Sequence, residues 1–215
     1  MAANNDARFW DRVSRRYARA KMGDPEGYER SLERTRGLLK PGDRVLELGC
    51  GTGTTALQLA GSVQRYLATD LSPGMIAIAE QRLKAAPLSR LGFRIATADS
   101  LAAEEARYDA VLGFNYLHLV RDLAGTLRHI HGMLVPGGVF ISKTPCLGDM
   151  NPLIRHVLLP ALRVARLAPH VVSLRAADLE ERIRTAGFEI VATEGHASKG
   201  KNTRPYIVAR KPSLP

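Results

Sequence analysis

The sequence is poor in cysteine and tryptophan, and it lacks any long apolar run. Only two cysteines occur among 215 residues, Cys50 and Cys146. They are too few for a disulfide framework or a zinc site. No run of about 18 apolar residues is present, so a membrane-spanning helix is not expected. The first residues are polar and include no apolar signal segment. These absences favour a cytoplasmic protein.

Acidic residues are also scarce relative to basic ones. The chain has 31 lysines and arginines against 21 aspartates and glutamates, a formal net charge of +10. Such a surface attracts polyanions, acidic membranes or acidic substrates, and charge alone chooses none of them. Arginine enrichment in a genome rich in G and C is an equally good explanation. The length suffices for one domain with a full core.

Strands and helices are predicted to alternate through the first two thirds of the chain. Such alternation is typical of a parallel, doubly wound α/β sheet, whose strands end at one ligand-binding edge. The predicted strands there are 43–48, 64–69, 92–96, 110–114 and 139–144. The predicted helices are 7–21, 26–38, 53–61, 73–85 and 122–134, the last closed by Pro136-Gly137-Gly138. Further along we expect helices over 151–168 and 176–186 and strands over 188–193 and 206–210.

The most informative motif joins the first of these strands to its helix. Residues 45–53 read Val-Leu-Glu-Leu-Gly-Cys-Gly-Thr-Gly, so a buried strand is followed by three glycines that let backbone approach a ligand. A dinucleotide fingerprint is Gly-x-Gly-x-x-Gly, and Thr54 stands where its third glycine belongs. The motif here is Glu-x-Gly-x-Gly-x-Gly. A dinucleotide-dependent oxidoreductase is therefore disfavoured.

On this motif and the acidic residues that follow later strands, residues 43–145 resemble class I S-adenosylmethionine-dependent methyltransferases of the small-molecule type. The resemblance implies a Rossmann-like doubly wound seven-stranded sheet, mostly parallel with a C-terminal antiparallel hairpin. It also implies one methyltransferase domain. Within it, 1–40 would form a helical lid, 41–145 the cofactor-binding core, and 146–215 cap helices and the hairpin.

S-adenosylmethionine (SAM) carries a cationic methionine portion, a ribose and an adenine, and the motif residues suit these groups. We expect Glu47 to lie near the methionine portion, where backbone groups of Gly49, Cys50 and Gly51 approach the same tail. Asp70 is expected to accept both ribose hydroxyls. A helix cap is the alternative role for such an aspartate.

Further cofactor contacts are expected after the second, third and fourth strands. The adenine would be covered by Leu71 and Met75, and its amino group accepted by Asp99, with Ser100 next to it. Phe114 and Asn115 would line the floor beside the methyl group. Asp99 could instead cap a turn.

The N-terminal helices supply two more candidates, Tyr17 and Tyr28, which could cover the cofactor. The alternative is that the aromatic stripe of the first helix is only its packing face.

Catalytic residues are harder to name, because methyl transfer depends mainly on alignment and needs a base only when the nucleophile is protonated. His118 is the best base candidate, although a packing or capping histidine is the favoured reading. Cys146 is read first as a small buried residue. The stretch Phe114-Asn115-Tyr116-Leu117-His118 lacks the polar-Pro-Pro-aromatic motif of nucleobase amino methyltransferases.

The predicted helix over 151–168 is apolar and basic. Its basic side chains share one arc, and no acidic residue occurs from 151 to 175. A cap helix with a solvated basic face is the simpler reading. Contact with an acidic membrane or a lipid-like substrate is the alternative, against which Pro160 counts. The basic residues are Arg155, His156, Arg163 and Arg166.

Together these observations predict a SAM-dependent methyltransferase that acts on an O, N or C atom of a small-molecule or lipid-like acceptor and leaves S-adenosylhomocysteine (SAH). No metal is expected. An RNA methyltransferase is the second hypothesis, favoured by net charge and disfavoured by the residues after 114. A non-catalytic SAM-binding or nucleic-acid-binding protein is a third.

Overall fold

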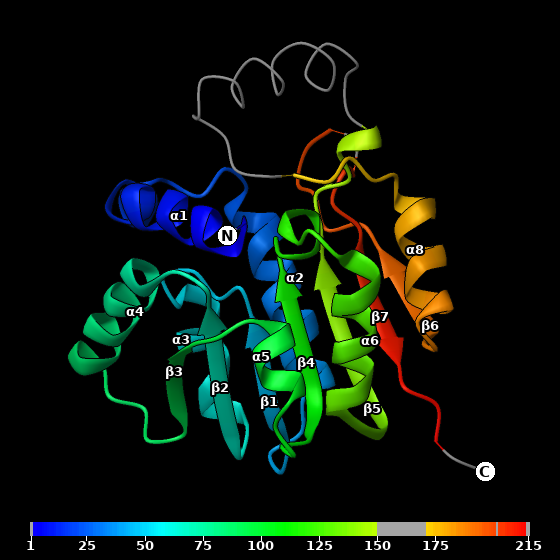
Figure 1. The fold of residues 1–215 in the computed structure, drawn as a ribbon, viewed down its shortest axis with the longest axis horizontal. Coiled ribbons are helices and arrows are strands. Elements are labelled where there is room, and N and C mark those ends of the chain that lie inside the picture. Colours follow the sequence, from blue (N-terminus) through cyan, green and yellow to red (C-terminus); the bar gives the residue numbers. More distant parts are fainter. Residues whose placement is uncertain (1, 150–170, 201, 214–215) are drawn as a thin grey trace.

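The protein is a seven-stranded sheet with helices on both faces (Figure 1). A computed structural model describes residues 2–149, 171–200 and 202–213. The predicted basic helix over 151–168 lies outside these residues. The strands are β1 (Arg44–Leu48), β2 (Arg65–Asp70), β3 (Leu91–Ile95), β4 (Tyr108–Phe114), β5 (Leu134–Lys143), β6 (Glu189–Glu194) and β7 (Tyr206–Arg210). The helices are α1 (Ala2–Arg19), α2 (Pro25–Leu38), α3 (Thr54–Leu59), α4 (Pro73–Ala85), α5 (Ala98–Ala102), α6 (Leu123–Met133) and α8 (Ala176–Thr185), with short 3₁₀ turns η1 (Ala60–Ser62), η2 (Leu117–Leu119) and η3 (Leu147–Asp149).

The strand order confirms the predicted architecture. It runs β3-β2-β1-β4-β5-β7-β6, with β1 to β5 parallel and β7 antiparallel to both of its neighbours. The chain moves outward in one direction from β1 to β3 and in the other from β4 onward. Ligands of such sheets bind where the order reverses, which here is the gap between the carboxyl ends of β1 and β4.

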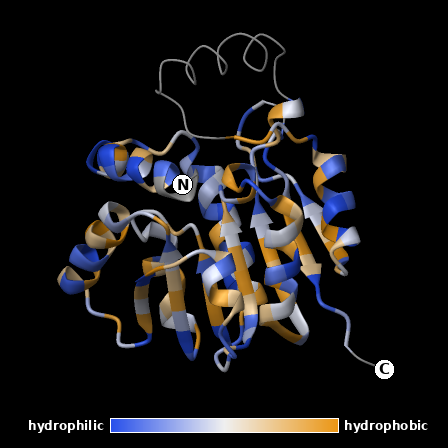
Figure 2. Cartoon of the chain, in the orientation of Figure 1, coloured by the Kyte–Doolittle hydropathy of each residue, from blue (hydrophilic) through white to orange (hydrophobic). Residues whose placement is uncertain are grey.

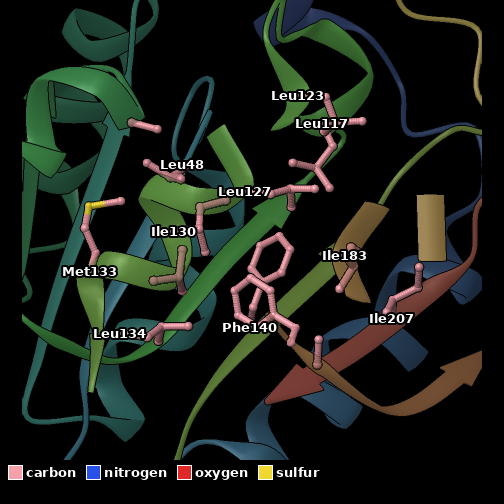
Figure 3. Close-up of a cluster of buried hydrophobic side chains, with 14 of the residues drawn as sticks. Leu48, Leu117, Leu123, Leu127, Ile130, Met133, Leu134, Phe140, Ile183 and Ile207 are labelled. Carbon is pink, nitrogen blue, oxygen red and sulfur yellow. The ribbon is translucent and has the colours of Figure 1, made fainter. Parts of the chain in front are cut away.

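Two apolar cores lie on opposite faces of the sheet, because neighbouring strand residues point to opposite sides. On β1, Val45 belongs to the core covered by α2, α3 and α4, whereas Leu46 belongs to the core covered by α5, α6 and α8. Figure 3 shows the second core, in which side chains of α6 and α8 surround Phe140 of β5.

The hydropathy colouring follows this layering, with orange along the inner strands and blue on outward helix surfaces (Figure 2). Among the described helices, none combines the length and apolarity needed to cross a bilayer.

Several elements differ from the predictions. Pro136-Gly137-Gly138 lies inside β5, which begins at Leu134, and does not form a turn. The reason is pairing with the chain beyond β7: Gly137 N donates to Lys211 O at 2.9 Å, and Lys211 N donates to Gly138 O at 2.9 Å. The first helix spans Ala2–Arg19, where 7–21 was expected. The short helix α5 was not predicted; Thr97 and Ser100 start it with a capping box.

The helix that follows the glycine loop starts differently from its neighbours, because it has no side-chain cap. Asp24 caps α2 and Ser72 caps α4 through their side chains, each followed by a proline in the first turn. The start of α3 has no side-chain cap. Gly53 precedes it with φ +76°, and a Cβ there would lie 2.6 Å from Phe93 Cζ and 3.0 Å from Ala79 Cβ.

Replacing Gly53 by alanine should lower the free energy of unfolding by about 1–3 kcal/mol, because the left-handed backbone and the packed neighbours both resist a side chain. Urea denaturation measures this. Gly61→Ala is the matched control, since nothing lies within 4 Å of a Cβ at that position and its φ is not left-handed. Equal effects of the two substitutions would contradict the argument.

Candidate functional site

A cavity of about 770 Å³ opens at the carboxyl edge of the parallel strands. Its walls come from the glycine loop after β1, the ends of β4 and β5, the end of α1, helix α2 and the loop between β6 and β7. It therefore lies at the reversal of strand order where a ligand was expected. Predicted site residues that line it are Tyr17, Tyr28, Glu47, Gly49, Cys50, Gly51, Phe114 and Asn115.

The glycine loop is held open by left-handed backbone. Gly49 has φ +68° and Gly51 has φ +55°. A Cβ at Gly49 would lie 2.6 Å from Cδ2 of Tyr116, so a larger residue would clash there. Between them, Cys50 N donates to Thr69 O at 2.9 Å, which fastens the loop to β2. Burial raises the pKa of the Cys50 thiol, so this cysteine stays protonated.

Asp70 joins the ends of β1 and β2. Its Oδ2 accepts the backbone N–H of Gly51 at 3.0 Å, and its Oδ1 accepts that of Ser72 at 2.9 Å. Burial raises the pKa of this carboxyl, while these hydrogen bonds act in the opposite direction. Tyr17 of α1 lies over Gly51, because its Cε1 would be 3.7 Å from a Cβ at that glycine. Burial raises the pKa of Tyr17, and the charge of Asp70 raises it further.

Glu47 lies at the base of the cavity and is only 2% exposed. Tyr66 Oη donates to its Oε2 at 2.8 Å. Burial raises the pKa of Glu47 to about 7, and the Tyr66 hydrogen bond opposes that rise. The carboxyl is therefore poised to change charge near neutral pH.

The end of β4 contributes the residues expected beside the methyl group. Phe114 stacks on Tyr206 with ring centroids 6.4 Å apart. Asn115 has φ +52°, and its N–H donates to Lys143 O at 2.8 Å. A left-handed residue other than glycine is uncommon, and here it ends the strand against the cavity.

His118, the weak base candidate, lies in η2 and is not among the residues that line the cavity. Burial, helped by the charge of Arg204, lowers its pKa to about 4. Its Nδ1 has no hydrogen-bond partner in the described part of the chain. The imidazole is thus neutral at physiological pH.

None of the residues expected to contact the adenine after β2 and β3 lines the cavity, so these contacts stay a prediction. Asp99 was expected to face the adenine, but its carboxylate lies 2.9 Å from His129 Nδ1 on α6, and its side chain is 76% exposed. Ser100 completes the capping box of α5. The physical reason is that α5 begins at Ala98 and turns Asp99 outward. Leu71 and Met75 follow Asp70, and Met75 is 2% exposed in the start of α4.

Helix α1 lies across the strand ends and covers the site (Figure 1). Asp11 Oδ1 accepts from Ser72 Oγ at 2.6 Å and from Gly74 N at 2.9 Å, so α1 caps α4. The two carboxylate oxygens of Asp6 accept hydrogen bonds from Nε and Nη2 of Arg121, at 2.7 and 2.9 Å. The sequence showed the helix but not these contacts, which no local pattern encodes.

Basic side chains of the cavity were also missed. Arg82 of α4 donates to Thr52 O at 3.0 Å, Thr52 Oγ1 at 2.9 Å and Ala18 O at 3.2 Å, so it joins the glycine loop to α1. Lys143 ends β5, and Arg204 precedes β7. Lys143 could have been found by the rule used for Asp70, that polar residues ending a parallel strand gather at the ligand-binding edge.

The sequence is similar to those of known methyltransferases. Residues 15–193 match a family described as "Methyltransferase domain". Over 103 residues the chain is 36% identical to a ubiquinone biosynthesis O-methyltransferase from Methylocella silvestris, covering 48% of this chain and 40% of that protein. It is 29% identical over 178 residues to a demethylmenaquinone methyltransferase from Symbiobacterium thermophilum, covering 69% of each. The chain thus spans less than half of the first relative.

A solved structure described as a DhpI–SAH complex has the same fold. Its TM-score is 0.76 at 20% identity, over 99% of this chain and 98% of that one. The family match, which covers most of the sequence, together with the strand order and the glycine loop confirms the predicted resemblance: the chain belongs to the methyltransferase-domain family.

Proposed function

We propose that the cavity binds SAM beside a small-molecule acceptor and that the chain aligns the two for methyl transfer. The arrangement that carries this proposal is the left-handed glycine loop set between two buried carboxyls, Glu47 and Asp70. The names of the quinone methyltransferase relatives support a small or lipid-like acceptor. In this proposal residues 1–40 act as a lid, 41–145 hold the cofactor, and 146–215 complete the acceptor side.

The site fits the cofactor in shape and charge. Each oxygen of Asp70 accepts one backbone N–H and keeps a further lone pair, which suits the two hydroxyls of a ribose. Glu47 can ionise beside a cationic methionine portion, because a nearby positive charge favours the carboxylate. Gly49 and Gly51 present backbone without a side chain in the way.

Bound SAM supplies a methyl carbon already activated by the sulfonium. The chain's own contribution is therefore alignment, which can lower a barrier by roughly 7–11 kcal/mol. Phe114 and Asn115 would fix the floor on which the reacting groups meet. Helix α1, fastened through Asp11 and Asp6, would exclude water from above.

Asp70→Ala tests the cofactor site. We expect it to weaken SAH binding roughly ten- to hundredfold, because charge-assisted hydrogen bonds to the ribose would be lost. Calorimetry with SAH measures this, and NAD should not bind the unmodified protein. Asp109→Ala is the matched control: Asp109 Oδ2 also accepts a backbone N–H, that of Arg44 at 2.8 Å, at the opposite end of β1. Unchanged SAH affinity in Asp70→Ala would show that the ribose site is misplaced.

Glu47→Gln tests the buried carboxyl through stability. The folded-state pKa of Glu47 is raised to about 7. In the unfolded chain it is about 4.3. Its stabilising contribution is therefore present below the unfolded pKa and is lost as pH rises through the folded one. The variant should match the unmodified protein near pH 4.5 and exceed its free energy of unfolding by about 1–3 kcal/mol at pH 8. Urea denaturation across this range measures the difference, and a difference independent of pH would contradict the assignment.

The basic segment 151–175 stays a candidate for contact with an anionic membrane surface. Arg155→Glu combined with Arg163→Glu should abolish co-sedimentation with anionic vesicles at low salt, because charge attraction carries such binding. Arg128→Glu combined with Arg210→Glu makes the same change of charge at two exposed positions elsewhere and serves as the control. No binding by the unmodified protein, or equal loss in both variants, would contradict membrane contact through this segment.

A further inference from the structure

The cavity carries more positive than negative charge. Within the described residues, five basic and two acidic side chains line it. The basic ones are Lys21, Arg82, Lys143, Lys199 and Arg204, and the acidic ones are Asp24 and Glu47.

The two acidic side chains offset only part of that charge, because the basic ones outnumber them. Asp24 already accepts the N–H of Gly27 at 3.0 Å and both the N–H and the hydroxyl of Ser198, at 3.0 and 2.5 Å. Glu47 is held by Tyr66 and is partly protonated at neutral pH. An anion entering the cavity would therefore meet uncompensated positive charge.

Lys143 is the best-placed of the basic groups. Its Nζ donates to Ser31 Oγ at 2.7 Å and to Gly27 O at 3.0 Å, both neutral oxygens of α2. An ammonium has three donors, so one remains for a ligand. Burial lowers the pKa of Lys143, and the charges of Arg204 and Arg30 lower it further while Asp24 acts in the opposite direction. A bound anion would relieve this cost.

Arg204 faces the same space. It makes no hydrogen bond or ion pair within the described part of the chain, and its side chain is exposed at the cavity wall. Its charge lowers the pKa of Lys143, of His118 and of Tyr17. Two of these residues, Lys143 of β5 and Tyr17 of α1, line the cavity together with Arg204.

A series of hydrogen bonds holds Ser31, the side chain that accepts from Lys143, in place. Ser31 Oγ lies 3.0 Å from Nδ1 of His196, whose Nε2 lies 3.0 Å from Glu194 Oε2. Arg34 Nε donates to the other oxygen of Glu194 at 2.8 Å. His196 is 7% exposed and packs on Tyr206 with ring centroids 4.5 Å apart. A charged group supported in this way is preorganised for a ligand.

We propose that Lys143 and Arg204 bind a carboxylate of the methyl acceptor, so that the acceptor class is a small carboxylic acid. The inference rests on the proposed function. The cofactor has a carboxylate of its own, and an experiment must separate the two sources. The acceptor is favoured, because Lys143 ends β5, whereas the loops assigned to the cofactor follow β1 and β2.

Matched acids and amides test the charge preference. The pairs are protocatechuate, salicylate and caffeate, each with its uncharged amide, titrated into the protein saturated with SAH and assayed for SAH formation from SAM. At least one acid should bind roughly tenfold or more tightly than its amide, the effect of one charge-assisted contact. Equal binding of every pair, preference for the amides, or no binding by any acid would overturn the proposal.

Two variants locate the preference. Arg204→Gln and Lys143→Met should each weaken acid binding roughly ten- to hundredfold and leave amide binding unchanged. Arg210→Gln is the control, because it removes the same charge from an exposed residue at the other end of β7. Circular dichroism and thermal melting establish that each variant is folded.

SAH affinity separates the remaining outcomes. It should stay within about twofold of the unmodified protein in both variants, a change smaller than one hydrogen bond. If SAH binding weakens as much as acid binding does, the two residues hold the cofactor carboxylate and the proposal fails while the methyltransferase assignment stands. If the unmodified protein does not bind SAH, the proposed function itself fails.

Discussion

The carboxylate of Asp70 is the interaction on which the site depends. By accepting one N–H from Gly51 and one from Ser72, it connects the glycine loop after β1 to the start of α4. Ser72 Oγ in turn donates a hydrogen bond to Asp11 of α1. The buried carboxylate of Asp70 therefore connects two strand ends and the covering helix. The carboxylate carries a desolvation cost that raises its pKa, and the two backbone donors offset part of it. The loop, the cap of α4 and the position of α1 are therefore one coupled unit.

Much of this unit could be predicted from sequence, because local rules govern it. Short apolar runs marked the buried strands, Pro73 marked the start of α4, and the glycine spacing marked the loop. Asp99 could not be placed in the same way. Its distance from β3 was right for a ligand contact, but the capping box of Thr97 and Ser100 starts a helix that turns it toward His129. Lys143 and Arg204 line the same cavity because β5 pairs with β7 in antiparallel register, and spacing along the chain does not reveal that pairing.

The cavity divides its charges between two regions. Near β1 the acidic group is Glu47, which is buried and held by the Tyr66 hydroxyl, so its charge responds to a ligand or to pH. Near β5 and β7 the hydrogen bonds of Lys143 go to neutral oxygens, and the charge of Arg204 lies close enough to lower its pKa. A cationic ligand portion is thus favoured at one end and an anionic one at the other. Such polarity orients a pair of ligands before any contact with the reacting atoms is made.

The fastening of α1 has a kinetic consequence. Contacts from Asp6, Asp11 and the carbonyl of Ala18 hold the helix to Arg121 and to both ends of α4. Detaching α1 requires all of these contacts to open, since releasing one leaves the others in place. Such detachment is a cooperative local unfolding of residues 2–19, with a rate set by the stability of the whole set of contacts.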